Sequence, residues 1–343
     1  MKAKDTRLKF LVAVVLLAGL LPLFLITTIS IYGFASGPLP GNSEVALVIS
    51  PDSSFRTITA KLADAKVITP DIRFRLLAGF MGVTGRLRAG EYIFKGGQNP
   101  YQVLRLLHQG SMVQRALTIP EGATLQQIAA ILDHGGWVKK NQFLKLCKSR
   151  EFISGLDLSV DSLEGYLFPD TYFFERGGVS PEKIITTMVL RMREILSEIR
   201  EEHDNLNGFD LHKLLTLASI VEKETAQPDE RPLIARVFLN RLKKGMKLQT
   251  DPTVIYGIEN FNGNLTRSDL QTPTPYNTYL FKGLPPGPIG NPGKAAILSV
   301  LNPAQGAYYY FVSKNDGSHY FSKTLSEHNQ AVARFQKRLY SRK

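Results

Sequence analysis

Residues 214–256 read LLTLASIVEKETAQPDERPLIARVFLNRLKKGMKLQTDPTVIY, an apolar helical stripe that ends in a carboxylate and is followed by a polar segment. At 3.6 residues per turn, Leu214, Val221 and Glu224 lie on one face of the predicted helix, so Glu224 continues the face that we expect to be buried. Glu222 lies about 200° from Glu224 around the same helix. A carboxyl group among apolar side chains loses solvation of its charged form, which raises its pKa and favours the protonated acid. Glu224 is therefore a candidate general acid, the group that cleavage of a glycosidic bond requires.

A glutamate in a helix is more often a solvated surface residue, and the pattern alone leaves that interpretation open. Thr225 and Pro228 end the predicted helix soon after Glu224, and catalytic groups often lie at such element ends, beside a cleft built from loops. The polar side chains that follow can hydrogen-bond a sugar or cap the next element. The candidates for substrate binding in this stretch are Asn240, Gln249, Thr250 and Asp251.

A second cluster, SLEGYLFPDTYFF at 162–174, surrounds an acidic residue with aromatic rings. Tyr166, Phe168 and Asp170 are candidates for contact with a sugar, because aromatic faces stack on sugar rings and a carboxylate accepts hydrogen bonds. A segment that crosses the hydrophobic core is an equally open interpretation. The later stretch GLPPGPIGNPG at 283–293 is too rich in proline and glycine for regular secondary structure, and it is a candidate wall of the cleft.

The N-terminal region contains 25 uncharged residues from 10 to 34, long enough to span a bilayer. Lys2, Lys4, Arg7 and Lys9 precede this run, so the positive-inside rule places the N-terminus in the cytoplasm. A cleaved signal peptide is the alternative, but its apolar core would be only about 7 to 15 residues long. We therefore expect a retained single-pass anchor in the inner (plasma) membrane, with the body of the protein on the periplasmic side.

The amino-acid composition limits the classes of partner expected for the part of the chain that follows the anchor. The chain has 42 Lys and Arg against 30 Asp and Glu, a formal net charge of +12 that suits phospholipid or an acidic polymer. Nucleic acid is not expected, because the body lies outside the cytoplasm and no nucleic-acid recognition motif is present. Six scattered histidines without an HExxH pattern predict neither a metal site nor a cofactor. The single cysteine, Cys147, excludes an internal disulfide, so stability depends on packing.

The order of predicted strands and helices indicates an α+β protein. Strands at 45–49 and 90–94 alternate with short helices in a small α/β subdomain that resembles a LysM module. The catalytic domain is predicted as a mixed α/β domain with the catalytic glutamate on a helix beside a cleft. The predicted segments are a cytoplasmic tail at 1–9, a transmembrane helix at 10–34, a linker at 35–43, the LysM-like subdomain at 44–115 and the catalytic domain at 116–343.

Long motifs along the chain resemble those of the YceG-like family of endolytic murein transglycosylases. They are LEGYLFPDTY at 163–172, LASIVEKET at 217–225, NRLKKGMKLQTDPTVIYG at 240–257, TPYNTY at 274–279 and GLPPGPIGNPG at 283–293. The resemblance implies cleavage within peptidoglycan glycan strands by a periplasmic domain tethered to the inner membrane, with peptidoglycan synthases as possible partners. It makes Glu224 the essential glutamate and adds Glu222, Tyr276 and Asn277 to the candidates for substrate binding.

One buried carboxyl predicts a lytic mechanism that leaves a 1,6-anhydro sugar end. The resemblance implies that such cleavage limits the length of nascent strands. A hydrolytic muramidase is the first alternative, and it would recruit a second carboxylate from among Asp251, Asp170 and Glu222. A non-catalytic glycan-binding scaffold is the other, with Glu224 serving only to cap or solvate its helix. A serine hydrolase is disfavoured because the chain has no G-x-S-x-G motif.

Overall fold

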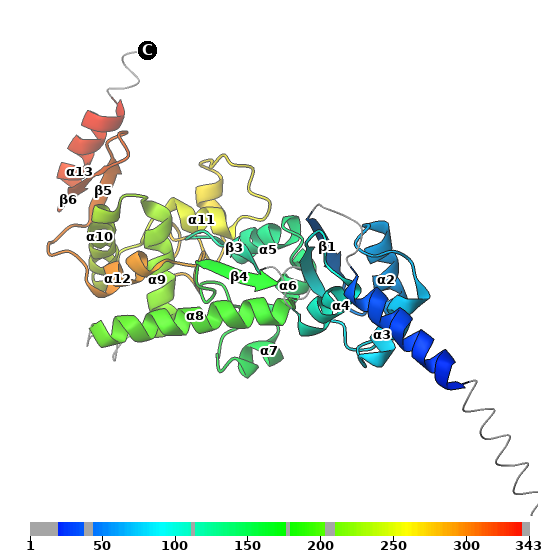
Figure 1. Cartoon of the computed structure of the whole chain (residues 1–343). Helices are drawn as coiled ribbons and strands as arrows, with labels where there is room; N and C mark the ends of the chain where they lie inside the picture. Colours follow the sequence, from blue (N-terminus) through cyan, green and yellow to red (C-terminus); the bar gives the residue numbers. More distant parts are fainter. Residues whose placement is uncertain (1–19, 38–43, 111–113, 176–178, 203–209, 338–343) are drawn as a thin grey trace, which may run out of the picture. The chain divides into compact units, whose positions relative to one another are not determined.

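The computed structural model describes residues 20–37, 44–110, 114–175, 179–202 and 210–337 (Figure 1). The chain forms two compact units. Unit 1 comprises Met1–Arg115 and Phe173–Val179, and unit 2 comprises Ala116–Tyr172 and Ser180–Lys343. The described residues contain many helices and three two-stranded sheets, which confirms the predicted α+β class.

Unit 1 is built on an antiparallel pair of strands. β1 (Val45–Ile49) pairs with β2 (Gly90–Phe94), and the register sets Val45 opposite Phe94 and Ile49 opposite Gly90. The helices of this unit are α2 (Phe55–Asp64), α3 (Ile72–Phe80) and α4 (Pro100–Gln109). Ser54, Asp71 and Asn99 each accept a backbone N–H at the start of one of these helices, which explains where the helices begin. The core is apolar and includes Ile58, Leu62, Phe74, Tyr92, Phe94 and Leu104.

A further helix covers residues 20–36 of unit 1. Its last turns pack against the core of the unit through Ile31, Phe34 and Ala35. Residues 10–19 of the predicted membrane span lie outside the described residues. Within the described ranges, no helix combines the length and the apolar character needed to cross a membrane.

Unit 2 contains the longer helices and a β-hairpin near its C-terminal end (Figure 1). The helices are α5 (Leu125–His134), α6 (Lys140–Leu146), α7 (Arg150–Gly155), α8 (Pro181–Glu202), α9 (Leu211–Glu224), α10 (Arg231–Lys243), α11 (Asp251–Gly257), α12 (Lys294–Leu301) and α13 (Leu325–Val332). Shorter turns are η2 (Pro228–Glu230), η3 (Asp269–Gln271) and η4 (Ala333–Lys337). The strands within this unit are β5 (Tyr310–Ser313) and β6 (His319–Ser322), which pair antiparallel. The boundary between the units falls within β3 (Gln114–Thr118) and within β4 (Thr171–Glu175).

Helix α9 lies at the centre of unit 2. Its residues from Leu214 to Val221 are all buried, and it packs against α10, α11 and α12. A helix that is buried all round carries small or hydrogen-bonded polar groups where it meets its neighbours. Ser219 fits this rule, because its hydroxyl donates to Thr216 O at 2.7 Å and accepts the N–H of Ile289 at 3.0 Å. The predicted burial of the stripe that leads to Glu224 is confirmed.

Candidate active site

Glu224 is the last residue of α9, and its carboxylate accepts a hydrogen bond from the hydroxyl of Thr250. The backbone turns to an extended conformation at Thr225, so the helix ends at this point. Burial raises the pKa of Glu224 to about 7, and the hydrogen bond from Thr250 opposes part of that effect. The direction is the one that the apolar stripe predicted. A carboxyl with such a pKa exchanges a proton readily near neutral pH.

Three ionisable groups from different segments affect the pKa of Glu224. Asp251 raises the pKa of Glu224, whereas His319 and Arg241 lower it. Arg241 is 7% exposed, and its guanidinium donates to Leu248 O and to Tyr309 O, each at 2.6 Å. The carbonyl groups therefore fix the position of this cation without neutralising it.

A network of threonines fixes the segment that holds Glu224. The N–H of Thr250 donates to the hydroxyl of Thr278 at 3.1 Å, and the hydroxyl of Thr253 donates to Thr250 O at 2.8 Å. Gln249 has a φ of +50°, a left-handed conformation that is uncommon for a residue other than glycine. Such backbone geometry persists only where the surroundings impose it, and it is frequent at functional sites. Thr250 is 2% exposed, so its hydroxyl reaches Glu224 from a rigid frame.

Glu230 connects the end of α9 to the β5–β6 hairpin. It accepts the backbone N–H of His319 and pairs with Nδ1 of the same residue, both at 2.6 Å. The hydroxyl of Thr225, the residue next to Glu224, donates to Glu230 Oε2 at 3.4 Å. This contact ties the first residue of β6 to the end of the helix that carries Glu224.

Glu222 occupies a different site, as its position on the helix predicted. Its side chain is 5% exposed, with Oε1 accepting from Arg231 at 3.0 Å and Oε2 accepting the N–H of Gly293 at 2.9 Å. Both oxygens are therefore engaged by the protein. Glu222 fixes the proline- and glycine-rich segment 283–293 against α9.

A second buried carboxyl, Glu164, was not among the predicted site residues. It is 6% exposed, and it accepts hydrogen bonds from Leu125 N, Tyr256 Oη and Asn291 Nδ2 at 3.1, 3.0 and 3.3 Å. Burial raises its pKa to about 7, although these hydrogen bonds favour the charged form. A groove of about 1010 Å³ lies beside it, between α5 and α11. Polar and aromatic groups of that groove include Gln127, Lys148, Lys223, Tyr256 and Phe261.

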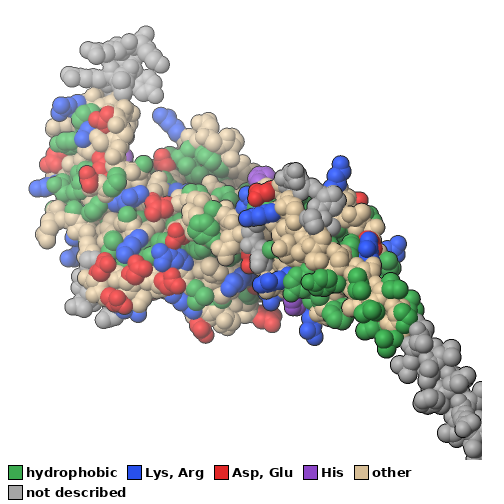
Figure 2. Space-filling view, viewed as in Figure 1, with side chains coloured by type: hydrophobic (Ala, Val, Ile, Leu, Met, Phe, Trp, Pro, Cys, Tyr) green, Lys and Arg blue, Asp and Glu red, His purple; other side chains and the backbone are tan. Residues whose placement is uncertain are grey.

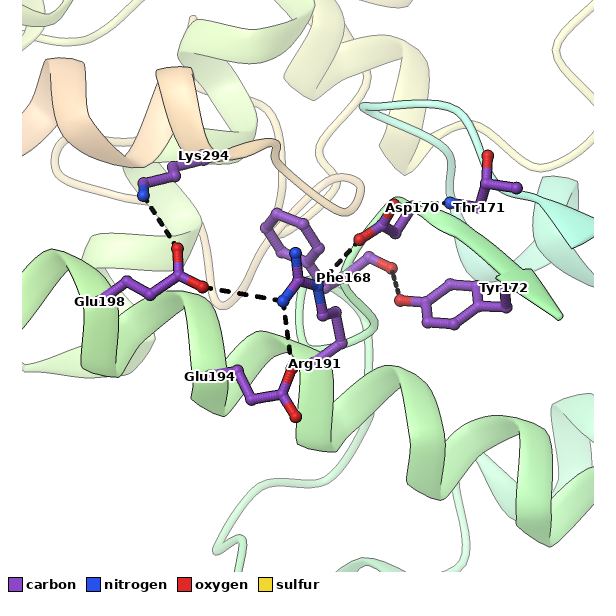
Figure 3. A network of polar contacts seen from close by, with 8 residues as sticks. All are labelled: Phe168, Asp170, Thr171, Tyr172, Arg191, Glu194, Glu198 and Lys294. Atoms are coloured by element: carbon purple, nitrogen blue, oxygen red, sulfur yellow. Dashed lines mark hydrogen bonds and ion pairs between the residues drawn. The ribbon is translucent and has the colours of Figure 1, made fainter.

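The predicted aromatic cluster lies mostly in the protein interior. Tyr166 is 3% exposed with its hydroxyl 3.0 Å from Nδ1 of His212, and Phe168 is 6% exposed. Asp170 pairs with Arg191 of α8 at 2.9 Å. Figure 3 shows Arg191 between Asp170, Glu194 and Glu198, with Lys294 on the far side of Glu198. This network attaches the loop before β4 to α8.

The remaining candidates are distributed around these elements. Asn240 donates to Gly306 O and Tyr308 O at 3.1 and 2.9 Å. Asn277 is fully buried, and its amide donates to Leu270 O and Thr272 O. Tyr276 contacts the ring of Tyr256 with centroids 4.7 Å apart. Of the predicted substrate-binding residues, Thr250 and Asp251 are the two that act directly on Glu224, and the binding roles of all of them stay predictions.

The chain is similar to a known protein family and to known proteins. Residues 47–334 match the model of the YceG-like family. An endolytic murein transglycosylase of Bacillus subtilis is 36% identical over 309 residues, which cover 85% of each chain. One from Streptococcus pneumoniae is 30% identical over 330 residues, 86% of this chain and 59% of that protein.

A solved structure is also similar. The crystal structure of a yceG-like protein from Listeria monocytogenes matches with a TM-score of 0.58 and 37% identity, over 85% of this chain and all of that one. The family match covers more than half of the chain, and it includes most of unit 2, part of unit 1 and the segments that surround Glu224. On this evidence the chain belongs to the YceG-like family.

Proposed function

We propose that this chain is an endolytic peptidoglycan lytic transglycosylase that cleaves the bond between N-acetylmuramic acid and N-acetylglucosamine within glycan strands. The observation that carries the proposal is Glu224, a desolvated carboxyl at the end of a buried helix with one oxygen bound by Thr250. The relatives from Bacillus subtilis and Streptococcus pneumoniae carry the name of this activity.

Glu224 serves as the acid and then as the base. The protonated carboxyl gives its proton to the glycosidic oxygen as the bond from C1 of N-acetylmuramic acid breaks, and positive charge develops on the sugar ring. The ionised carboxylate then takes the proton of the C6 hydroxyl, whose oxygen bonds to C1. The products are a free hydroxyl on one fragment and a 1,6-anhydro end on the other, and Glu224 regains its proton.

Thr250 determines how Glu224 presents its proton. Because the threonine hydroxyl donates to Oε1, the proton of the acid form belongs on Oε2, which is then the oxygen that faces the substrate. The same hydrogen bond becomes stronger when Glu224 is charged, so it stabilises the state that forms as the glycosidic bond breaks.

The substrate contacts that we propose first are those of the exposed residues next to this pair, Gln249 and Asp251. The other candidates support the site through the contacts described above. They are Glu222, Tyr166, Phe168, Asp170, Asn240, Tyr276 and Asn277. Lys223, which lies between Glu222 and Glu224 on α9, also lines the groove beside Glu164. That groove therefore adjoins the catalytic helix. A glycan strand is long enough to occupy more than one such surface.

A hydrolytic muramidase is the second candidate, favoured by the effect of Asp251 on Glu224. Asp251 is exposed, and one of its oxygens accepts the hydroxyl of Tyr279 at 2.6 Å. A carboxylate in that position could activate water. Digestion of defined glycan strands by the full chain separates the two reactions, because a hydrolysed end is heavier than an anhydro end by the mass of water, about 18 daltons. Anhydro ends alone support the lyase, and hydrolysed ends overturn it.

The proposal extends to location and domain roles. The uncharged run at 10–34 anchors the chain in the inner membrane with its N-terminus in the cytoplasm, and the body acts on the periplasmic side. Residues 44–115 form the LysM-like subdomain, and residues 116–343 carry the catalysis. Two strands enclosing two helices in unit 1 support the first assignment, and Glu224 in unit 2 supports the second. Synthases that make the glycan strands are the class of partner that this location would bring close.

A further inference from the structure

Helix α3 of unit 1 exposes a row of apolar side chains. Ile72, Leu76 and Phe80 are 70%, 49% and 89% exposed, and their spacing of four residues puts them on one face of the helix. The opposite face is also apolar, with Phe74 and Leu77 buried in the core of the unit. Packing within the unit therefore accounts for one face of α3 and leaves the other unexplained.

This exposed face continues onto the helix at residues 20–36. Large apolar side chains of that helix are 57–74% exposed, namely Leu20, Leu21, Leu23, Phe24, Leu25, Ile26, Ile29 and Tyr32. A groove of about 760 Å³ runs between the two helices, and Phe24, Thr28, Phe80 and Tyr101 contribute to its lining. Figure 2 shows hydrophobic side chains gathered over this part of the unit. An apolar surface of this extent needs a covering partner.

The two helices are fixed to each other. Ile31, Phe34 and Ala35 pack on the core of unit 1, and the guanidinium of Arg73 on α3 lies 4.7 Å from the centroid of the Phe34 ring. The groove itself joins Phe80 to Phe24, which lies well inside the uncharged run at 10–34. A bilayer that receives Phe24 is therefore close to Phe80.

Charge also favours a lipid surface. Arg75 lies on one edge of the exposed apolar face of α3, where helices that lie on anionic membranes carry such cations. Arg73 on the other edge is paired with Asp71 at 2.6 Å. Residues 44–115 contain ten Lys and Arg against five Asp and Glu, a net charge of +5. Anionic headgroups attract such a unit, and the apolar side chains enter the acyl layer beneath them.

We propose that Ile72, Leu76 and Phe80 of α3, together with Tyr101, form a membrane-contact face that inserts into the surface of an anionic phospholipid bilayer beside the anchor. This inference rests on the proposed membrane anchor and adds a second, peripheral attachment to it. The anchor and α3 then both attach unit 1 to the bilayer, which restricts its orientation more than the anchor alone would.

The test uses the full chain reconstituted in vesicles of phosphatidylglycerol and phosphatidylethanolamine. Single tryptophans replace Phe80, Leu25 or Val48 in separate variants, and the signal of the native Trp137 is subtracted. Val48 is the matched control, because it is an exposed apolar residue of the same unit, 41% exposed on β1. Lipids brominated along the acyl chain then quench any tryptophan that enters the bilayer. We expect quenching of Phe80→Trp to exceed that of Val48→Trp by about fivefold or more and to approach that of Leu25→Trp.

The reporters separate the possible failures. Strong quenching of Leu25→Trp with weak quenching of Phe80→Trp overturns the membrane-contact face and leaves the anchor in place. Absence of quenching at Leu25 overturns both. A blue-shifted, unquenched Phe80→Trp in a chain that cross-links as a dimer means that a second copy covers the face, which overturns the lipid assignment. An unchanged melting temperature for each variant shows that the substitutions have left the fold of unit 1 intact.

Discussion

Thr250 and Glu224, separated by 26 residues in the sequence, are joined by a hydrogen bond in which the threonine hydroxyl donates to Oε1 of the carboxylate. Thr250 is itself held by Thr278 and Thr253, so the donor cannot follow a carboxylate that moves away. Burial raises the pKa of Glu224, and the hydrogen bond from Thr250 lowers it. Rigid support of this kind keeps an acid in place while its charge changes.

Replacing Thr250 by valine removes the hydroxyl and keeps the shape. Because this hydrogen bond lowers the pKa of Glu224, its loss raises that pKa, and the alkaline limb of the pH profile of kcat/KM moves to higher pH. We expect kcat to fall at the same time, since the charged carboxylate loses its donor. Thr250→Ser is the control and should retain the wild-type profile. An unchanged profile in Thr250→Val would mean that this hydrogen bond has no influence on catalysis.

Glu224→Gln should reduce activity, whereas Glu222→Gln should reduce stability. Glutamine at 224 cannot transfer a proton, so activity on glycan strands should fall by about 100-fold to 10,000-fold with little change in Tm. Glutamine at 222 keeps a hydrogen-bond acceptor but loses the ion pair with Arg231, which should cost about 1–3 kcal/mol of unfolding free energy while most activity remains. Both variants are measured by turnover and by thermal unfolding. If Glu222→Gln abolishes turnover and Glu224→Gln does not, the catalytic assignment is reversed.

The contrast between Glu224 and Glu164 shows what the sequence can predict. The buried residues of α9 that lead to Glu224 recur at spacings that a helical pattern displays, so the burial of this stripe could be inferred. Glu164 is enclosed by Leu125, Tyr256 and Asn291, which are 39, 92 and 127 residues away. No local pattern contains those contacts. Its place within an apolar and aromatic run was the one available signal.

The same distinction applies to secondary structure and to the aromatic cluster. Helices with clear caps were predictable, such as α4 after Asn99 and α5 after Thr124, because a capping side chain acts within its own turn. The short helices α6 and α7 have weak local signals and were not predicted. Whether Tyr166 and Phe168 face a ligand or the core depends on tertiary packing, and the structure places both in the interior.

Glu164 should make stability depend on pH. Its pKa in the folded protein is raised from 4.5 to about 7, so the folded state holds a proton that the unfolded state has released. The corresponding stability is fully present below about pH 4.5 and is lost as the pH rises through about 7. Relative to Glu164→Gln, the native chain should lose up to about 3 kcal/mol of unfolding free energy between these pH values.

Glu224 titrates in the same direction, so this comparison is made in a Glu224→Gln background. Denaturant unfolding at pH 4.5, 6 and 8 supplies the free energies. Parallel curves for the two chains would show that Glu164 is ionised in the folded protein across this range, contrary to the prediction.

Truncation should reveal how the helix at 20–36 supports unit 1. Removal of residues 1–36 deletes Ile31, Phe34 and Ala35, which pack on the core, whereas removal of residues 1–29 keeps them. We expect the shorter product to unfold at a lower temperature, by an amount that corresponds to about 1–3 kcal/mol for partly buried apolar side chains. Both products should cleave isolated glycan, because Glu224 and its contacts lie in unit 2. Equal melting temperatures would show that the packing of this helix adds no stability.

The pKa of Glu224 can also be changed through His319, which Glu230 holds in place. His319 lowers that pKa, and Glu230 fixes the histidine through its backbone N–H and its ring. His319→Gln removes this effect, so the pKa of Glu224 should rise and the alkaline limb of kcat/KM should again move to higher pH. His328→Gln is the matched control, because His328 stacks on Tyr310 at 5.3 Å in the same unit. Thr250 and His319 both act on one carboxyl, so the alkaline limb should move further in the double variant than in either single variant. If it moves no further than in Thr250→Val alone, His319 serves only to hold the hairpin.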